Sequence, residues 1–152
     1  MNIFYEKFAD RIRVDENGCH LWQGWLNEYG YSRFRSDGQR GYGHRIAYQM
    51  VKGEIPAGME IDHACQQRAC VNPDHLRLAT RAQNIAHQRL QARNTSGVRG
   101  VSWHKQAQKW VARVRVDGRT INLGVFADKA EAAKVAAETR ARYFGEFSGD
   151  AA

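Results

Sequence analysis

The clearest periodic pattern lies in the C-terminal part of the chain. Apolar and charged residues alternate over 110–116, and a second alternating run covers 119–123. Asp117 and Gly118 separate the two runs, and Asp-Gly between alternating runs is a strong hairpin signal. A third short run of β type begins near Val101. The pattern predicts a three-stranded antiparallel sheet.

A helical pattern follows the predicted sheet. Residues 129–144 mix alanine with charged side chains, and Asp128 before them can cap the first turn with Glu131 as its reciprocal partner. Gly145 is a stop signal. The apolar face at steps of three or four consists of Ala132, Val135, Ala136, Thr139 and Tyr143. One helix lying across the sheet is the economical arrangement.

The region 18–90 has no such regularity. Its apolar runs are short, it contains both prolines, and no long amphipathic helix is expected before Thr80. Residues 59–62 and 76–79 are typical of short strands, and 80–90 of a helix capped by Thr80. This region therefore predicts an irregular α+β unit.

Residues 91–97 are polar and turn-prone, so they are the best candidate linker. We expect an α+β protein of two units, 1–92 and 93–152. A chain of 152 residues gives each unit only a small core. A large multi-layer enzyme is excluded.

The charge is unevenly distributed. The formal net charge is +7. Residues 1–92 carry 12 basic and 10 acidic side chains, whereas 93–152 carry 11 and 6. Between Arg81 and Arg119 there are nine basic residues and one acid, Asp117. Such a stripe suits a phosphate backbone, although a solvated basic face would look the same.

Membrane insertion and export are not expected. The sequence has no run of about 18 apolar residues. Acids are scattered through the first 18 residues, and no apolar stretch with a cleavage site follows. We therefore expect an intracellular protein.

The three cysteines indicate a metal site. An odd number without a secretory signal argues against a disulfide framework. Cys65 and Cys70 are separated by four residues and His75 follows five after Cys70, which suits sulfur and imidazole ligands of tetrahedral zinc. Cys19 is the remaining thiol and the candidate fourth ligand. The alternative is that the cysteines are buried small hydrophobes.

Polar residues near this loop suggest catalysis. His63 precedes Cys65 by two residues, so zinc at Cys65 would hold it rigidly as a general base. Asp62 and Asn84 offer hard oxygens to Mg²⁺ or another divalent ion. His87, three residues after Asn84, suits a metal or phosphate ligand or a solvent-facing helical position.

The run from His63 to Leu76, followed by Asn84, resembles the HNH nucleases of the ββα-metal superfamily, in particular the His-Cys box branch. Upstream pieces at 19–24, 29–34 and 44–48 resemble phage-type HNH endonucleases. The resemblance implies His63 as general base and Asn84 as a metal ligand. It implies Asp62 as an acidic ligand, although some His-Cys box enzymes lack an acid there. It also implies structural zinc on Cys19, Cys65, Cys70 and His75.

The C-terminal unit resembles the AP2 DNA-binding domain in its pieces at 98–103, 109–115 and 123–126. That resemblance implies a sheet in the major groove of DNA. By strand alternation Arg113 and Arg115 share a face opposite Ala112. The expected DNA-binding residues are Arg99, Trp103, Arg113, Arg115 and Arg119. The alternative for Trp103 and for Trp110 is ordinary core packing.

Together these features predict a metal-dependent DNA endonuclease that hydrolyses phosphodiester bonds in double-stranded DNA. HNH and AP2 units occur together in mobile phage endonucleases, so the cytoplasm of a bacterial host is the expected location. The alternative is a non-catalytic, sequence-specific DNA-binding protein with a structural zinc site. An RNA-directed activity is a weaker reading because A-form grooves exclude sheets. The sequence leaves open the target, nicking or double-strand cutting, monomer or homodimer, and the roles of Arg33, Arg35, His44 and Arg45.

Overall fold

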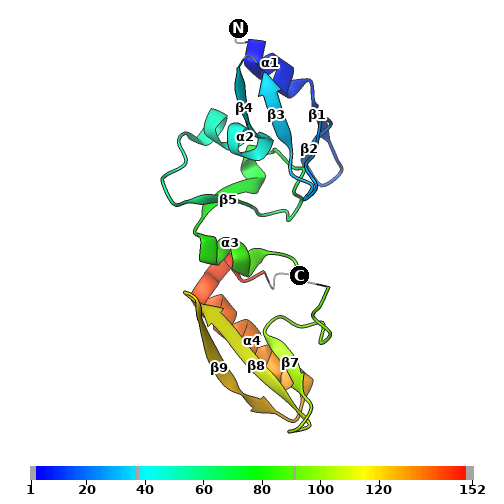
Figure 1. Ribbon diagram of the computed structural model, residues 1–152, viewed down its shortest axis with the longest axis vertical. Coiled ribbons are helices and arrows are strands. Elements are labelled where there is room, and N and C mark those ends of the chain that lie inside the picture. The colour runs from blue at the N-terminus through cyan, green and yellow to red at the C-terminus, as the bar shows by residue number, and fades with distance from the viewer. Residues whose placement is uncertain (1–2, 37, 91, 150–152) are drawn as a thin grey trace. The chain divides into compact units, whose positions relative to one another are not determined.

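The computed structural model describes residues 3–36, 38–90 and 92–149 (Figure 1). The predicted α+β class is confirmed by small antiparallel sheets and helices. The chain divides into two compact units, Met1–Thr80 and Arg81–Ala152. The helix α3 (Arg81–His87), which the sequence grouped with the first unit, packs within the second. Among the described residues, no helix is long and apolar enough to cross a membrane.

The first unit contains three two-stranded antiparallel sheets, β1-β2, β3-β4 and β5-β6, in its described part. Its elements in chain order are α1 (Ile3–Ala9), β1 (Ile12–Val14), β2 (His20–Trp22), β3 (Arg33–Ser36), β4 (Gln39–Tyr42), α2 (Gly43–Lys52), β5 (Glu60–His63), the 3₁₀ turn η1 (Pro73–His75) and β6 (Leu76–Ala79). The two strands expected around the cysteine loop are β5 and β6, and the first of them extends to His63.

Aromatic rings form much of the core of the first unit. Phe8, Trp22 and Phe34 are each almost completely buried, with ring centroids 4.9 to 5.4 Å apart. Ala47 and Tyr48 of α2 and Ile61 of β5 join the same cluster. Burial of such large rings stabilises a unit that has little other apolar surface.

The helix α2 was not expected from the sequence. Its buried face consists of Gly43, His44, Ala47 and Tyr48, while the apolar Met50 and Val51 are exposed. Two of the four buried residues, Gly43 and His44, are not apolar, so the buried face carries a weak apolar signal. Its first residue, Gly43, has to be glycine, because a Cβ there would lie 2.5 Å from the Ser32 hydroxyl oxygen.

The second unit contains the predicted three-stranded antiparallel sheet, in the order β7-β8-β9. Its strands are β7 (Val101–His104), β8 (Lys109–Val116) and β9 (Arg119–Phe126), the last longer than the expected 119–123. Asp117 and Gly118 form the hairpin turn with φ of 48° and 79°, which fits the two-residue turn that Asp-Gly favours.

The helix α4 (Lys129–Phe144) covers one face of this sheet (Figure 1). Its Ala132 and Ala136 pack against Val101 and Ala112. Asp128 caps the helix by accepting from the Ala130 amide at 3.1 Å, and Gly145 ends it, as predicted. Tyr143 is 54% exposed, so its expected place on the packed face is wrong; the buried row continues at four-residue steps through Arg140 and Phe144.

The expected linker is a structured turn over its described part. The Ser96 hydroxyl is buried and donates to the Val101 carbonyl at 2.7 Å, and it accepts from the Val98 amide. Asn94 accepts from the Gly97 amide at 2.9 Å. The segment therefore belongs to the second unit. Gln91, where the expected linker begins, lies outside the described residues.

Candidate metal centre and general base

The four predicted zinc ligands lie together in the first unit. The ligand atoms of Cys19, Cys65, Cys70 and His75 all lie within 4.8 Å of one another. Cys19 and Cys70 are buried, whereas Cys65 and His75 are half-buried. This cluster could hold a metal such as zinc.

Backbone hydrogen bonds bring the distant Cys19 to the loop. The Asp15 carboxylate accepts from the Cys19 amide at 2.8 Å and fixes the turn before β2. The amide of Trp22 donates to the Ala69 carbonyl, and the amide of Val71 donates to the His20 carbonyl. The strand after Cys19 therefore pairs with the segment that carries Cys70.

The distances fit a tetrahedral zinc ion. Bonds of about 2.3 Å to sulfur and about 2.0 Å to nitrogen place a tetrahedral sulfur and nitrogen about 3.5 Å apart. The Sγ atoms of Cys19 and Cys70 lie 3.5 Å and 3.7 Å from the Nδ1 atom of His75. Three thiols and one imidazole form a closed structural set rather than a site with an open position.

The three cysteine thiols have different pKa values. A hydrogen bond from Cys70 lowers the pKa of Cys65 to about 5, and the same hydrogen bond raises the pKa of Cys70. Burial raises the pKa of Cys19. The Cys70 sulfur also accepts from the Asn72 amide at 3.4 Å. Hydrogen bonds of this kind stabilise the thiolate, which is the form that binds a metal.

His63 is held by the same loop. It ends β5, is 6% exposed, and its Nε2 atom lies 3.0 Å from the Cys70 carbonyl oxygen. A carbonyl can only accept, so Nε2 carries the proton and the neutral ring keeps its lone pair at Nδ1. Burial lowers the pKa of His63, which favours this neutral form. The ring has the tautomer that a general base at Nδ1 needs.

His44, whose role the sequence left open, packs against His63. The ring centroids lie 4.9 Å apart, and Tyr31 contacts both rings. His44 is 7% exposed, and its Nδ1 atom has no hydrogen-bond partner in the described part of the chain. Burial lowers the pKa of His44 to about 3, with the charges of His63 and Arg45 adding to the effect. Of the other open residues, Arg33 stacks over Tyr42 with its Cζ 4.5 Å from the ring centroid.

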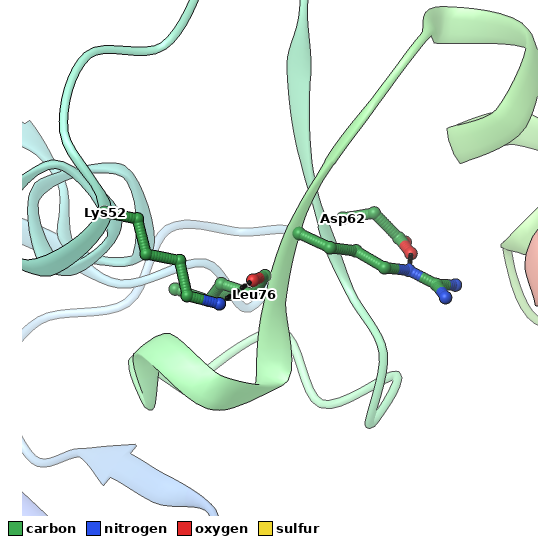
Figure 2. Close-up of polar contacts among 4 residues, drawn as sticks. Lys52, Asp62 and Leu76 are labelled. Carbon is green, nitrogen blue, oxygen red and sulfur yellow. Dashed lines mark hydrogen bonds and ion pairs between the residues drawn. The ribbon is translucent and has the colours of Figure 1, made fainter.

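Asp62 forms an ion pair across the β5-β6 hairpin. Its Oδ2 atom lies 2.8 Å from the Nε atom of Arg77, directly opposite in the register (Figure 2). A carboxylate offers two oxygens with about four acceptor positions. Figure 2 also shows Lys52, at the end of α2, donating to the Leu76 carbonyl at 2.9 Å. This bond ties α2 to the hairpin that carries His63.

The other predicted metal ligand, Asn84, lies on α3 in the second unit and is half-buried. His87 on the same helix is 7% exposed, and its ring lies 6.5 Å from that of Phe147. A solvent-facing position for His87 is therefore wrong, because the helix turns this residue into the second unit.

The five expected DNA-binding residues do not share one face of the sheet. Arg113 and Arg115 are exposed and lie opposite Asn122 and Thr120. Trp103 pairs with Trp110, in the row of β8 that also contains Ala112 beneath α4. The register places Arg119 opposite Val116, which belongs to the same row of β8 as Ala112.

The two tryptophans of the sheet differ in burial. Trp103 remains 41% exposed, whereas Trp110 packs against the core, as the alternative interpretation of this residue expected.

Comparison with known proteins supports the nuclease class. Residues 42–86 match the family model described as HNH endonuclease, a segment that includes Asp62, His63, Cys65, Cys70, His75 and Asn84. Because the match covers less than half of the chain, it identifies an HNH endonuclease segment, which suggests nuclease activity.

The chain is also similar to curated phage proteins. It is 36% identical to Protein 2.8 of Escherichia phage T7 over 52% of this chain and 55% of that protein. It is 32% identical to Protein 3.8 of the same phage over 53% of this chain and 66% of that protein. It is 43% identical to the Uncharacterized gene 5.3 protein of Enterobacteria phage T3 over 28% and 42%. The chain thus spans less than two thirds of each relative's length. No solved structure matches it.

Proposed function

We propose that this chain is a metal-dependent DNA endonuclease of the phage homing or HNH type, with His63 as the general base. The observation that carries the proposal is the contact between His63 Nε2 and the Cys70 carbonyl. It supports a fixed imidazole whose Nδ1 atom accepts protons, on a segment that matches the HNH endonuclease family.

The reaction follows from this tautomer. The Nδ1 atom of His63 takes a proton from water, and the water oxygen forms a bond to phosphorus. The bond between phosphorus and the 3′ oxygen breaks, the 3′ oxygen takes a proton from solvent water, and a 5′ phosphate and a 3′ hydroxyl remain. The buried ring cannot swing away, because β5 and the Cys70 carbonyl fix both of its ends. Cys19, Cys65, Cys70 and His75 would hold structural zinc and so keep this carbonyl in place.

Asp62 would bind the catalytic divalent ion, and the family resemblance gives Asn84 the same role. Carboxylate and amide oxygens are ligands that Mg²⁺ accepts, and Mn²⁺ suits the same set. When bound, the ion stabilises the charge that develops on the phosphate and the leaving oxygen. The assignment of Asn84 rests on the family resemblance, and that of Asp62 on the resemblance together with its burial beside His63.

The second unit would supply DNA affinity. Its AP2-like sheet presents the exposed Arg113 and Arg115, which suits contact with double-stranded DNA. The similarity to phage proteins supports action on DNA inside an infected bacterial host.

One observation favours a second candidate, a non-catalytic DNA-binding protein with structural zinc. The Asp62–Arg77 pair gives the carboxylate a structural partner within the hairpin. In that case the zinc loop would only stabilise the fold of the first unit.

A plasmid assay separates the candidates. The full chain is incubated with supercoiled plasmid and Mg²⁺, in parallel with a sample containing excess chelator and with Asn84→Ala. The nuclease predicts open-circular or linear product with Mg²⁺ alone, no product with chelator, and a strong loss for Asn84→Ala. A protein that binds the plasmid but leaves it supercoiled at every Mg²⁺ concentration is the non-catalytic candidate.

A further inference from the structure

The second unit contains a groove that is rich in arginine. Two cavities of about 550 and 570 Å³ share Arg99, Arg115 and Arg140 in their walls. The walls come from α3, the segment after it, β8 and α4. We call the two cavities together the arginine groove. Its arginines are Arg81, Arg89, Arg93, Arg99, Arg115 and Arg140, and the one acid among its described lining residues is Asp117.

The fold, rather than the sequence order, assembles this groove. Five of its arginines come from the basic stripe between Arg81 and Arg119, and Arg140 joins them from α4. The remaining basic residues of the stripe lie on the sheet strands and the β7-β8 turn. The fold therefore separates these five arginines from the rest of the stripe.

Arg140 holds the wall of the groove in place. It is 9% exposed, and its Nη2 atom donates to the carbonyl of Ala86 at 2.7 Å and to that of Ser148. These bonds tie the end of α3 and the turn after α4 to one buried side chain. α3 lies beside that turn in Figure 1. These hydrogen bonds therefore fix the elements that form the walls of the groove.

Arg115 makes no side-chain hydrogen bond or ion pair among the described residues, yet it lines both cavities. Guanidinium groups gathered in one cavity repel each other, and an anion placed between them removes that cost. Arginines drawn from a helix, a loop and a strand are spread along the groove, which suits several phosphates in a row better than a single one. Guanidinium groups bind phosphate oxygens through two parallel N–H donors.

We propose that the arginine groove binds the sugar–phosphate backbone of double-stranded DNA. This inference rests on the proposed function for its ligand, and it assigns Arg115 to phosphate rather than to a base edge. Arg113, on the same strand but outside the groove, keeps the sheet-face role. The second unit would then bind DNA through two surfaces. The sheet face with Arg113 would contact base edges, and the arginine groove would contact the phosphates.

The test compares arginines inside and outside the groove in the full chain. The groove variants are Arg93→Gln and Arg115→Gln, and the control is Arg142→Gln, an exposed position on α4 that does not line the groove. All are made with His63→Ala, so that cleavage does not disturb the binding measurement. Affinity for a fluorescent duplex is measured over a salt series, with circular dichroism to check folding.

We expect each groove variant to weaken binding to every duplex alike and to lower the slope of log affinity against log salt by about 0.9 per lost phosphate contact. The control should keep the parent slope. Equal slopes for groove and control variants would overturn the inference.

The failure of this inference can be told apart from the failure of the proposed function. If the plasmid assay gives no cleavage while the groove variants lose slope, the nuclease proposal fails and the groove stands. If the plasmid is cut while groove and control variants bind alike, the groove fails and the nuclease stands.

Discussion

The Nε2 atom of His63 lies 3.0 Å from the carbonyl oxygen of Cys70, so the residue proposed as general base is fastened to a residue of the metal cluster. This contact makes metal binding and base orientation parts of one structure. A change at the cluster should therefore alter catalysis without touching the reacting atoms.

Removing the metal should unfold the first unit. A structural zinc ion contributes about 10 to 16 kcal/mol of binding free energy to a small domain, and this unit has only a small core besides. We expect Cys70→Ala to lose zinc and most of its cooperative unfolding transition. Cys65→His still offers a ligand atom and should therefore retain zinc. Elemental analysis and thermal melting check this. A zinc-free protein of unchanged stability would contradict it.

Replacing His44 should raise the stability of the protein and slow cleavage. Its buried Nδ1 atom lacks a partner in the described residues, and such a group costs about 1 to 3 kcal/mol. We expect His44→Phe, which keeps a ring against His63, to raise the free energy of unfolding by about 1 kcal/mol and to slow cleavage. Urea unfolding and plasmid cleavage measure the two effects. A stable variant with parental cleavage would show that His44 only fills space.

Asp62→Asn distinguishes a metal ligand from a structural partner. The amide can still accept from Arg77, so the hairpin should remain folded with a loss of about 1 to 3 kcal/mol. We expect cleavage to fall about 10²-fold and to need more Mg²⁺, because the charge that attracts the ion is gone. The exposed Glu54→Gln is the control. A stability loss with normal Mg²⁺ dependence would assign Asp62 to the hairpin alone.

Arg113 should affect sequence preference rather than overall affinity. Its place on the exposed sheet face suits a contact with a base edge, which contributes about 1 to 3 kcal/mol at one base pair. Selection of bound duplexes from a randomised pool, for the parent and for Arg113→Gln, measures this. A variant that weakens all duplexes equally and selects the same sequences would place Arg113 on phosphate.

The sequence predicted the metal cluster and the second unit's sheet and helix, because cysteine spacing, the Asp-Gly turn and the Asp128 cap are local signals. It missed α2, because two of its four buried residues, Gly43 and His44, are not apolar. It also grouped Trp103 and Arg119 with Arg113, because alternation orders one strand but says nothing of the register with its neighbours. The His63–Cys70 bond and the place of Arg140 depend on tertiary contacts that no spacing encodes.

The central claim is that His63 is the general base. Its most direct test is the single-turnover rate of plasmid cleavage by the parent and by His63→Ala, with His104→Ala in the second unit as control and zinc content measured in all three. We predict that His63→Ala loses about 10²- to 10⁴-fold in rate while it keeps its zinc and its DNA affinity. Cleavage by a zinc-loaded His63→Ala at the parental rate would contradict the account.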